Sequence, residues 1–193
     1  VNCSEVVIKE NSIIECDLGV YLNMVNSAYI TSNNILGWQS NTGSTMPGIS
    51  MQSCGGYLRN NLIRYHNFGV LLAHSSPVLG VNTIEYNYKC GLFIDIGSYP
   101  NLVQQLANPT CWYPIGGCNI IKNNGTFMYL PPSTPQIIPD GAEIFLNIAD
   151  VRLSYGYNEI SDDRTGIPEY LTLPLIKGTR SRGAREFFVD RNY

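Results

Sequence analysis

Charged residues are scarce in this chain. Lysine, arginine, aspartate and glutamate make up 14% of the 193 residues, whereas hydrophobic residues make up 44%. So few charges exclude a helical bundle, whose surfaces carry far more of them, and so many hydrophobic residues exclude a long disordered chain. The formal net charge of −3 gives no reason to expect a nucleic-acid partner. With 18 Gly, 11 Pro and 13 Tyr, the composition favours a soluble, turn-rich β protein.

Several motifs that mark particular functions are also missing. No hydrophobic run approaches the roughly 20 residues that cross a bilayer, so the sequence predicts no membrane span. The chain has 6 cysteines but no CxxC pair and no cluster of Cys and His, which argues against structural zinc. It also has no glycine-rich phosphate loop, no nucleophile elbow and no metal-binding helix motif. We therefore predict no cofactor.

A short internal repeat runs through most of the chain. Asn-x-(Ile/Leu) recurs six times, with successive steps of 23, 27, 21, 37 and 39 residues. In the first four copies a Gly and an alternating apolar pair follow, which is the period of a short β-strand. We identify the six copies as Asn11–Ile13, Asn34–Leu36, Asn61–Ile63, Asn82–Ile84, Asn119–Ile121 and Asn158–Ile160.

Short strands at a period of about 22 residues, with no helix between them, suit a solenoid coil of three strands per circuit. We expect equivalent residues to stack in interior columns about 4.8 Å apart. An antiparallel sandwich is the alternative, but sandwiches do not repeat the same residue types in phase. The Gly before each pair fits a turn with positive φ or a close backbone approach. The three expected columns are Val20, Ile49, Val70, Leu92; Leu22, Met51, Leu72, Ile94; and Ile13, Leu36, Ile63, Ile84, Ile121, Ile160.

Two segments, Ser75-Ser76-Pro77-Val78 and the stretch from Asn82 to Ile94, resemble right-handed parallel β-helix repeats of the pectate-lyase-like superfamily. The resemblance covers residues 3 to about 163 and implies an all-β, right-handed parallel β-helix. It does not imply one activity, because the superfamily holds polysaccharide lyases, glycoside hydrolases, phage tailspikes, adhesins and noncatalytic domains. Family habit and low charge suggest an extracellular, cell-surface or periplasmic location.

The long last two repeats and the C-terminal segment depart from the regular coil. We interpret residues 98–117 and 128–141 as loops that project from it. Residues 164–193 lose the repeat and carry a net charge of +3, so we predict an irregular basic tail or cap after a β-helix domain at 1–163.

The repeat restricts which cysteines can form disulfides. Cys111 and Cys118 share one predicted loop and are the best pair, and Cys3 with Cys16 is a weaker candidate. We interpret Cys16, Cys54 and Cys90 as small, buried thiols. Two glycosylation sequons, at Asn2 and Asn124, are expected by chance in a chain so rich in Asn.

The turn after each Asn phrase holds the candidate binding residues. Trp38, Tyr65 and Tyr86 each come four residues after their Asn, so they would stack into an outward-facing aromatic strip. Such a strip can bind the apolar faces of sugar rings. It can equally be a ladder that only stabilises neighbouring circuits. His66, one residue further on, either replaces an Asn that hydrogen-bonds the turn, as the family resemblance implies, or acts as a catalytic base.

Asp162 and Asp163 form the only carboxylate pair, which makes them the candidate catalytic residues. A turn role also explains them, because they occupy the same positions as Asn123 and Asn124 in the preceding repeat.

The hypothesis we favour is a noncatalytic β-helix domain that serves as a surface scaffold or binds a polysaccharide or cell-surface glycan. One alternative is a lyase or hydrolase of an acidic glycan. The other is a structural subunit that self-associates through its coil ends and assembles into filaments.

Overall fold

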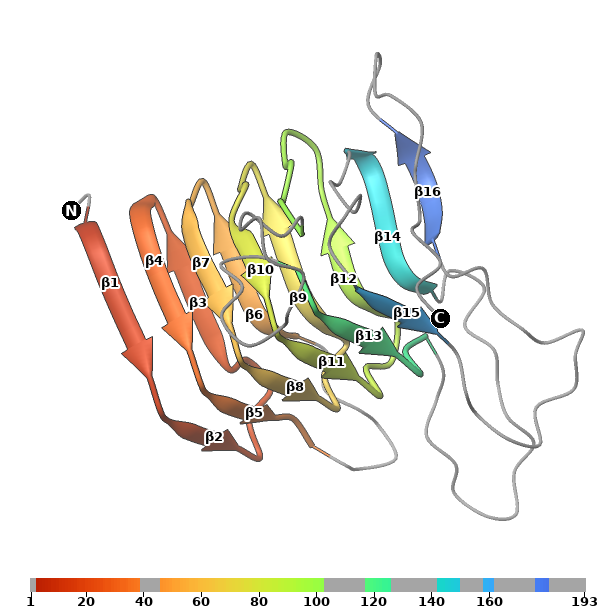
Figure 1. Ribbon diagram of the computed structural model, residues 1–193, viewed down its shortest axis with the longest axis horizontal. Coiled ribbons are helices and arrows are strands. Elements are labelled where there is room, and N and C mark those ends of the chain that lie inside the picture. Colours follow the sequence, from red (N-terminus) through yellow and green to blue (C-terminus); the bar gives the residue numbers. More distant parts are fainter. Residues whose placement is uncertain are drawn as a thin grey trace, which may run out of the picture.

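The computed structural model of the 193-residue chain describes residues 3–38, 46–102, 117–125, 142–149, 158–161 and 176–180. Every regular element in these ranges is a β-strand, and all the strand pairs are parallel. The strands form three sheets that wind around one axis, so the chain makes a parallel β-helix (Figure 1). The predicted three-strand coil is therefore confirmed. No helix in the described ranges is long and apolar enough to cross a bilayer.

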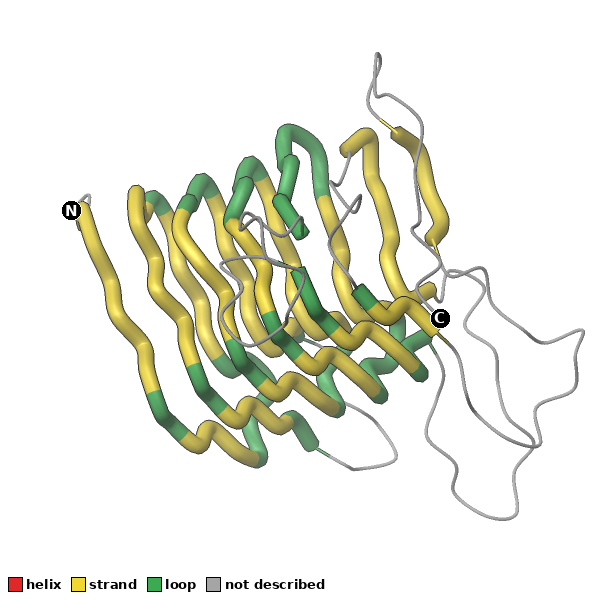
Figure 2. The backbone as a smooth tube through the Cα atoms, in the orientation of Figure 1, coloured by secondary structure: helices red, strands yellow, loops and turns green. Residues whose placement is uncertain are grey.

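Each of the first four circuits, or rungs, contributes one strand to each sheet, and the described residues of the last two contribute strands to the second and third sheets. We name the sheets A, B and C in the order in which the chain visits them (Figure 2). Sheet A contains β1 (Cys3–Lys9), β4 (Val25–Thr31), β7 (Gly56–Arg59) and β10 (Val78–Gly80). Sheet B contains β2 (Ser12–Ile14), β5 (Asn34–Leu36), β8 (Leu62–Arg64), β11 (Thr83–Glu85), β13 (Ile120–Lys122) and β15 (Glu159–Ser161). Sheet C contains β3 (Val20–Asn23), β6 (Pro47–Gln52), β9 (Phe68–Ala73), β12 (Cys90–Ile94), β14 (Ala142–Ala149) and β16 (Ile176–Arg180).

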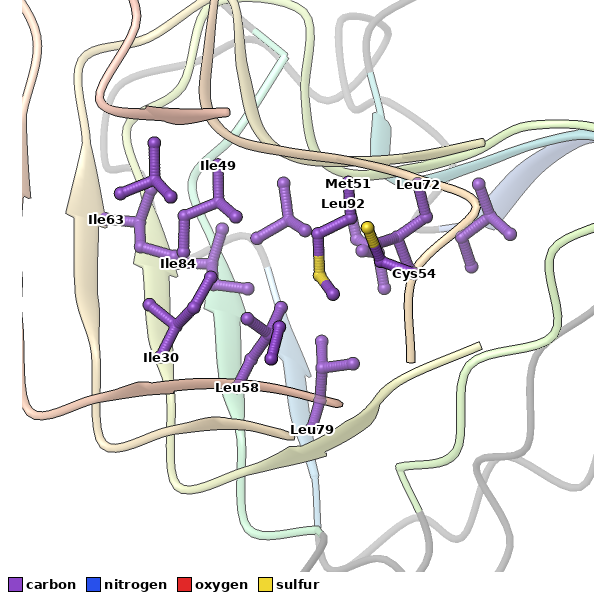
Figure 3. Close-up of a cluster of buried hydrophobic side chains, with 14 of the residues drawn as sticks. Ile30, Ile49, Met51, Cys54, Leu58, Ile63, Leu72, Leu79, Ile84 and Leu92 are labelled. Carbon is purple, nitrogen blue, oxygen red and sulfur yellow. The ribbon is translucent and has the colours of Figure 1, made fainter. Parts of the chain in front are cut away.

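The interior columns of sheet C follow the predicted register. Val20 pairs with Ile49, Ile49 with Val70, and Val70 with Leu92, and the second predicted column aligns in the same way. Both columns continue into β14 through Ile144 and Leu146. The side chains stack into one hydrophobic core, part of which is seen in Figure 3. A single rung cannot bury its own apolar face, so stacking supplies the stability.

The third column was predicted with one wrong member. Ile35, rather than Leu36, pairs with Ile13 on one side and Ile63 on the other. Ile35 is fully buried, whereas Leu36 is partly exposed on the outer face. The second repeat therefore begins at Asn33, and the prediction was shifted by one residue because Asn33 and Asn34 are adjacent.

Side-chain ladders hold each of the three corners between the sheets. At the A–B corner, each backbone N–H donates to the amide oxygen of the Asn in the next rung, at 3.0–3.1 Å. The ladder consists of Asn11, Asn33, Asn61, Asn82, Asn119 and Asn158. At the C–A corner, Ser75 and Ser98 accept the backbone N–H groups of Cys54 and Ser75, both at 3.0 Å. The Cys54 thiol accepts from the Val25 N–H at 3.5 Å, so this cysteine takes the place of a serine.

Most of these turns are formed by a single residue with positive φ, and the next residue in the chain belongs to the ladder. At the A–B corner they are Glu10, Ser32, Asn60, Val81 and Cys118. The glycines before the apolar pairs serve the other purpose foreseen for them, a close backbone approach, and none has positive φ. A Cβ at Gly69, for example, would lie 2.4 Å from Cγ2 of Ile84 and 2.6 Å from the carbonyl oxygen of Gly91.

The cysteine predictions are resolved in part. Cys16, Cys54 and Cys90 are free thiols, as expected, so the alternative pairing of Cys3 with Cys16 is wrong. Burial raises the pKa of Cys16 and of Cys90, which keeps both thiols protonated. Cys118 is disulfide-bonded. Its proposed partner, Cys111, lies outside the described residues, so that pairing stays a prediction.

The C-terminal tail is not irregular throughout. Residues 176–180 form β16, which pairs in parallel with β14 and adds a sixth strand to sheet C. The prediction missed this strand because the Asn-x-(Ile/Leu) phrase is absent there. The domain boundary at residue 163 lies outside the described residues and stays a prediction. Most of the two predicted loops, at 98–117 and 128–141, also lies outside them, so their projection from the coil stays a prediction too.

Candidate functional site

The B–C corner, where the chain passes from sheet B to sheet C, carries the candidate binding residues. Tyr65 and Tyr86 have φ of 62° and 55°, and the residue after each belongs to an interior ladder. Because the ladder residue points inward, the tyrosine before it is left on the outside, half-buried. Local backbone geometry therefore places both phenol rings on the surface.

The two tyrosines form the pair that the sequence predicts. Their ring centroids lie 6.3 Å apart, with 20° between the ring planes. The Asn123 amide donates to the Tyr86 hydroxyl at 3.5 Å, so the column continues into the next rung. The Arg64 guanidinium lies 6.0 Å from the centroid of the Tyr86 ring. The stacked pair is therefore fixed by neighbours along the axis.

Trp38 does not belong to this column, and the prediction that it does is wrong. The one-residue shift of the second repeat puts Gly37 above Tyr65, where a Cβ would lie 2.2 Å from the Tyr65 carbonyl oxygen. Trp38 lies one position further along the same corner and is 45% exposed. The structure thus brings all three predicted residues to one corner, but it stacks only two of them.

Tyr88 is a fourth aromatic residue of this corner, and the sequence analysis missed it. Its hydroxyl donates to the Trp38 carbonyl oxygen at 2.8 Å. Burial raises the pKa of Tyr88, and the neighbouring Tyr65 raises it further, so the hydroxyl remains a donor. We call Trp38, Tyr65, Tyr86 and Tyr88 the B–C aromatic cluster. The Tyr-x-Tyr spacing of residues 86 and 88 is the sequence feature that could have indicated a second tyrosine at this corner.

Two ion pairs flank the cluster on the outer face of sheet B. Arg64 pairs with Glu85, which occupies the equivalent position in the next rung. The Glu85 side chain is only 6% exposed and that of Arg64 33%. Further along the sheet, Lys122 lies 3.8 Å from Glu159. The charges of these four side chains are thus paired within the protein.

A buried ladder supports the cluster from inside. The His66 N–H donates to the Asn87 amide oxygen at 3.1 Å, and the Asn87 N–H to that of Asn124 at 3.0 Å. His66 is fully buried, and burial lowers its pKa to about 4. The prediction that His66 replaces a ladder Asn is confirmed. A catalytic base must reach its substrate, so the alternative role does not fit a buried imidazole.

The ladder ends on a carboxylate that the sequence analysis did not identify. The Asn124 N–H donates to Glu143 Oε1 at 3.0 Å, and Glu143 is 2% exposed. By spacing, residue 163 would come next in this ladder, but Glu143 from sheet C is the acceptor. Asn124 is itself fully buried and its amide is used in the ladder, so it is not a glycosylation site in the folded protein.

The candidate catalytic residues Asp162 and Asp163 lie outside the described residues, so their role stays untested. Within the described ranges, no group of three or more His, Cys, Asp or Glu side chains lies close enough to hold a metal ion.

Comparison with known proteins agrees with the fold. The family model of the right-handed β-helix region matches residues 1–129. Neither the curated proteins nor the solved structures gave a match to this chain. The match covers about two thirds of the 193 residues and the same coils that the structure describes best. The chain therefore belongs to the right-handed β-helix family.

Proposed function

We propose that this β-helix is a noncatalytic scaffold that binds carbohydrate at its B–C corner. The observation that carries the proposal is the B–C aromatic cluster, in which the exposed Trp38 shares one corner with the stacked pair of Tyr65 and Tyr86. Flat aromatic rings bind the apolar faces of sugars at low entropic cost. Because the two tyrosine rings face each other, Trp38 offers the stacking face and the tyrosine hydroxyls offer hydrogen bonds.

Rigidity of the corner supports this role. The Tyr88 hydroxyl fixes the backbone of Trp38, and the buried ladder of His66 and Asn87 fixes the turns that carry Tyr65 and Tyr86. A preorganised site loses less entropy when it binds its ligand. The stacked tyrosines occupy equivalent positions of two successive rungs, so the site can extend along the coil axis over more than one sugar unit.

The acidic groups near the site favour a binding role over catalysis. Glu85 is paired with Arg64, and Glu143 accepts hydrogen bonds from the ladder. Each of these carboxylates has a structural partner, and a glycoside hydrolase needs two that face the same sugar.

Replacing Trp38 by Ala should weaken glycan retention about tenfold, because it removes the exposed stacking face that the described residues offer at this corner. Affinity gel electrophoresis with immobilised polysaccharides measures the change, and thermal unfolding checks that the coil is intact. Tyr65→Ala should weaken retention less. The matched controls are Tyr21→Ala, which removes an exposed aromatic from sheet C, and Tyr57→Ala, which breaks the stacked pair of Tyr29 and Tyr57 on sheet A. Equal retention by the Trp38 variant and wild type would contradict the proposal.

Self-assembly through the coil ends is a second candidate function. In the first rung, the inward-facing Val6, Ile8 and Ile13 are only partly buried. Under the binding proposal, negative-stain electron microscopy should show single rods of one size at both low and high salt. Filaments that shorten as salt is added would instead favour assembly through charged ends.

A further inference from the structure

We infer that the B–C corner takes a neutral glycan and discriminates against acidic ones. The inference rests on the proposed carbohydrate binding and concerns the class of sugar. It starts from the cations around the cluster, because a uronate or sulfate group would need one of them as a partner.

The cation nearest to the aromatic rings is already occupied. Arg64 lies over the Tyr86 ring, but its guanidinium is paired with Glu85. An acidic sugar that captured Arg64 would leave the Glu85 carboxylate without its counter-ion, although that side chain is only 6% exposed. An uncompensated buried charge is strongly unfavourable. Competition for Arg64 therefore disfavours an anionic ligand.

Two further cations near this corner, among the residues that the structure describes, do not offer a better partner. Lys122 lies next to Glu159 at 3.8 Å. Lys89 is exposed, but its ammonium lies 5.6 Å from the centroid of the Phe68 ring, and Phe68 in turn packs edge-on against Phe93 of sheet C. Lys89 thus faces the sheet C side of the corner, whereas the stacked tyrosines follow the strands of sheet B.

The aromatic groups that the cluster itself offers a ligand are uncharged. They are the indole of Trp38, which is exposed, and the phenol groups of Tyr65 and Tyr86, which are half-buried. Stacking and neutral hydrogen bonds of this kind suit hydroxyl-rich sugars. Neutral recognition also implies that binding changes little with salt, since no ion pair forms.

Affinity gel electrophoresis against a neutral β-glucan and against polygalacturonate tests the inference. Wild type should be retarded by the neutral polymer, equally at low and high salt, and not by polygalacturonate. In Glu85→Gln the guanidinium of Arg64 loses its partner, so retention on polygalacturonate should rise at least about fivefold at low salt. The double variant Arg64→Gln/Glu85→Gln should lose that gain, and Lys89→Gln should behave as wild type. Thermal unfolding of every variant confirms that the coil is folded.

Failure of this inference differs from failure of the proposed function. Wild type that binds polygalacturonate more tightly than the neutral polymer, in a salt-sensitive manner, would overturn the inference and leave carbohydrate binding in place. The same holds if Lys89→Gln abolishes retention, because the ligand would then be held by that cation. Wild type that is retained by neither polymer contradicts the proposed function itself.

Discussion

Replacing Asn82 by Ala is expected to lower the free energy of unfolding by about 4 kcal/mol. Asn82 is 1% exposed and stands in the middle of the A–B ladder. Its amide oxygen accepts from the N–H and from the side-chain amide of Asn61, at 3.1 and 3.0 Å. Its own amide donates to the Leu58 carbonyl at 2.8 Å and to Asn119 at 2.9 Å.

The loss is large because the partners of Asn82 cannot reach water. Each intact hydrogen bond contributes roughly 1 kcal/mol, but a buried donor or acceptor that is left unpaired costs about 1–3 kcal/mol. Asn61 and Asn119 are both buried, so their orphaned groups bear that cost. The substitution breaks hydrogen bonds to the rung before Asn82 and to the rung after it. Asn82 is therefore more costly to remove than an Asn at either end of the ladder.

Urea denaturation followed by circular dichroism measures the effect. Asn82→Asp keeps the volume and the acceptor but loses both donor bonds, so it should also destabilise the protein strongly. Asn147→Ala is the matched control, because that exposed side chain makes a bond of 2.7 Å to Asp95 at the surface. Removal of a surface bond should cost less than about 1 kcal/mol. If Asn82→Ala cost no more than Asn147→Ala, the ladder would not be a main source of stability.

The sequence predicts the coil well because two separate conditions limit which residue can stand at each inward-facing position of the repeat. An inward-facing residue must be apolar to fill the core, and it must match the equivalent residue of both neighbouring rungs. Val20, Ile49, Val70 and Leu92 meet both conditions, and their column is confirmed. Parallel pairing without a helix between strands leaves few other arrangements for so short a period.

The same logic failed where the sequence offered two equivalent choices. Asn33 and Asn34 both fit the repeated phrase, and the spacing to the next copy at Asn61 did not decide between them. Hydrogen bonds decide, because the Asn33 oxygen accepts from the Asn11 N–H at 3.0 Å. A shift of one residue exchanges the inward and outward faces of a strand. Trp38 was consequently assigned to the wrong column.

Contacts between rungs were harder to predict than positions within a rung. The pairing of Arg64 with Glu85 follows from the register once the repeat is aligned, but neither residue indicates it when each rung is considered alone. Glu143 lies beyond a predicted loop that breaks the regular spacing, so no alignment assigned it to a ladder. Tyr88 acts across two rungs, which a comparison of neighbouring repeats does not detect.

Acid is expected to destabilise the protein through His66, by about 3 kcal/mol between pH 6.5 and pH 4. The unfolded chain carries a histidine with a pKa near 6.5, whereas burial lowers the pKa of the folded-state imidazole to about 4. Between these two values the unfolded state binds a proton that the folded state does not. The free energy of unfolding therefore falls as the pH falls through this window. The destabilisation that is due to His66 is absent above about pH 6.5 and complete below about pH 4.

The surroundings of the ring explain why it resists protonation. Its Nδ1 lies 3.3 Å from the Asp17 carbonyl oxygen, which fixes the proton of the neutral ring on Nδ1. Nε2 is buried and has no hydrogen-bond partner among the described residues. Protonation would place a charge and an N–H donor there without an acceptor. Asp17 favours the charged form, but desolvation is the larger influence.

The variant His66→Asn isolates this contribution from that of the carboxylates, which also titrate in acid. Asn is the natural choice, because Asn87 and Asn124 fill the equivalent positions of the next two rungs. At pH 7 the smaller side chain should cost about 1 kcal/mol through the void beside Gly48. Between pH 7 and pH 4 the variant should lose about 3 kcal/mol less than wild type, as measured by urea denaturation across the range.

His74→Asn serves as the control, since the only other histidine of the chain is exposed. Its unfolding curves should follow those of wild type at every pH. A wild-type pH profile retained by His66→Asn would mean that acid acts on the coil elsewhere than at this imidazole. Because the folded-state imidazole stays neutral above about pH 4, the ladder beneath Tyr65 keeps its geometry in this window, and glycan retention by the folded protein should not change there.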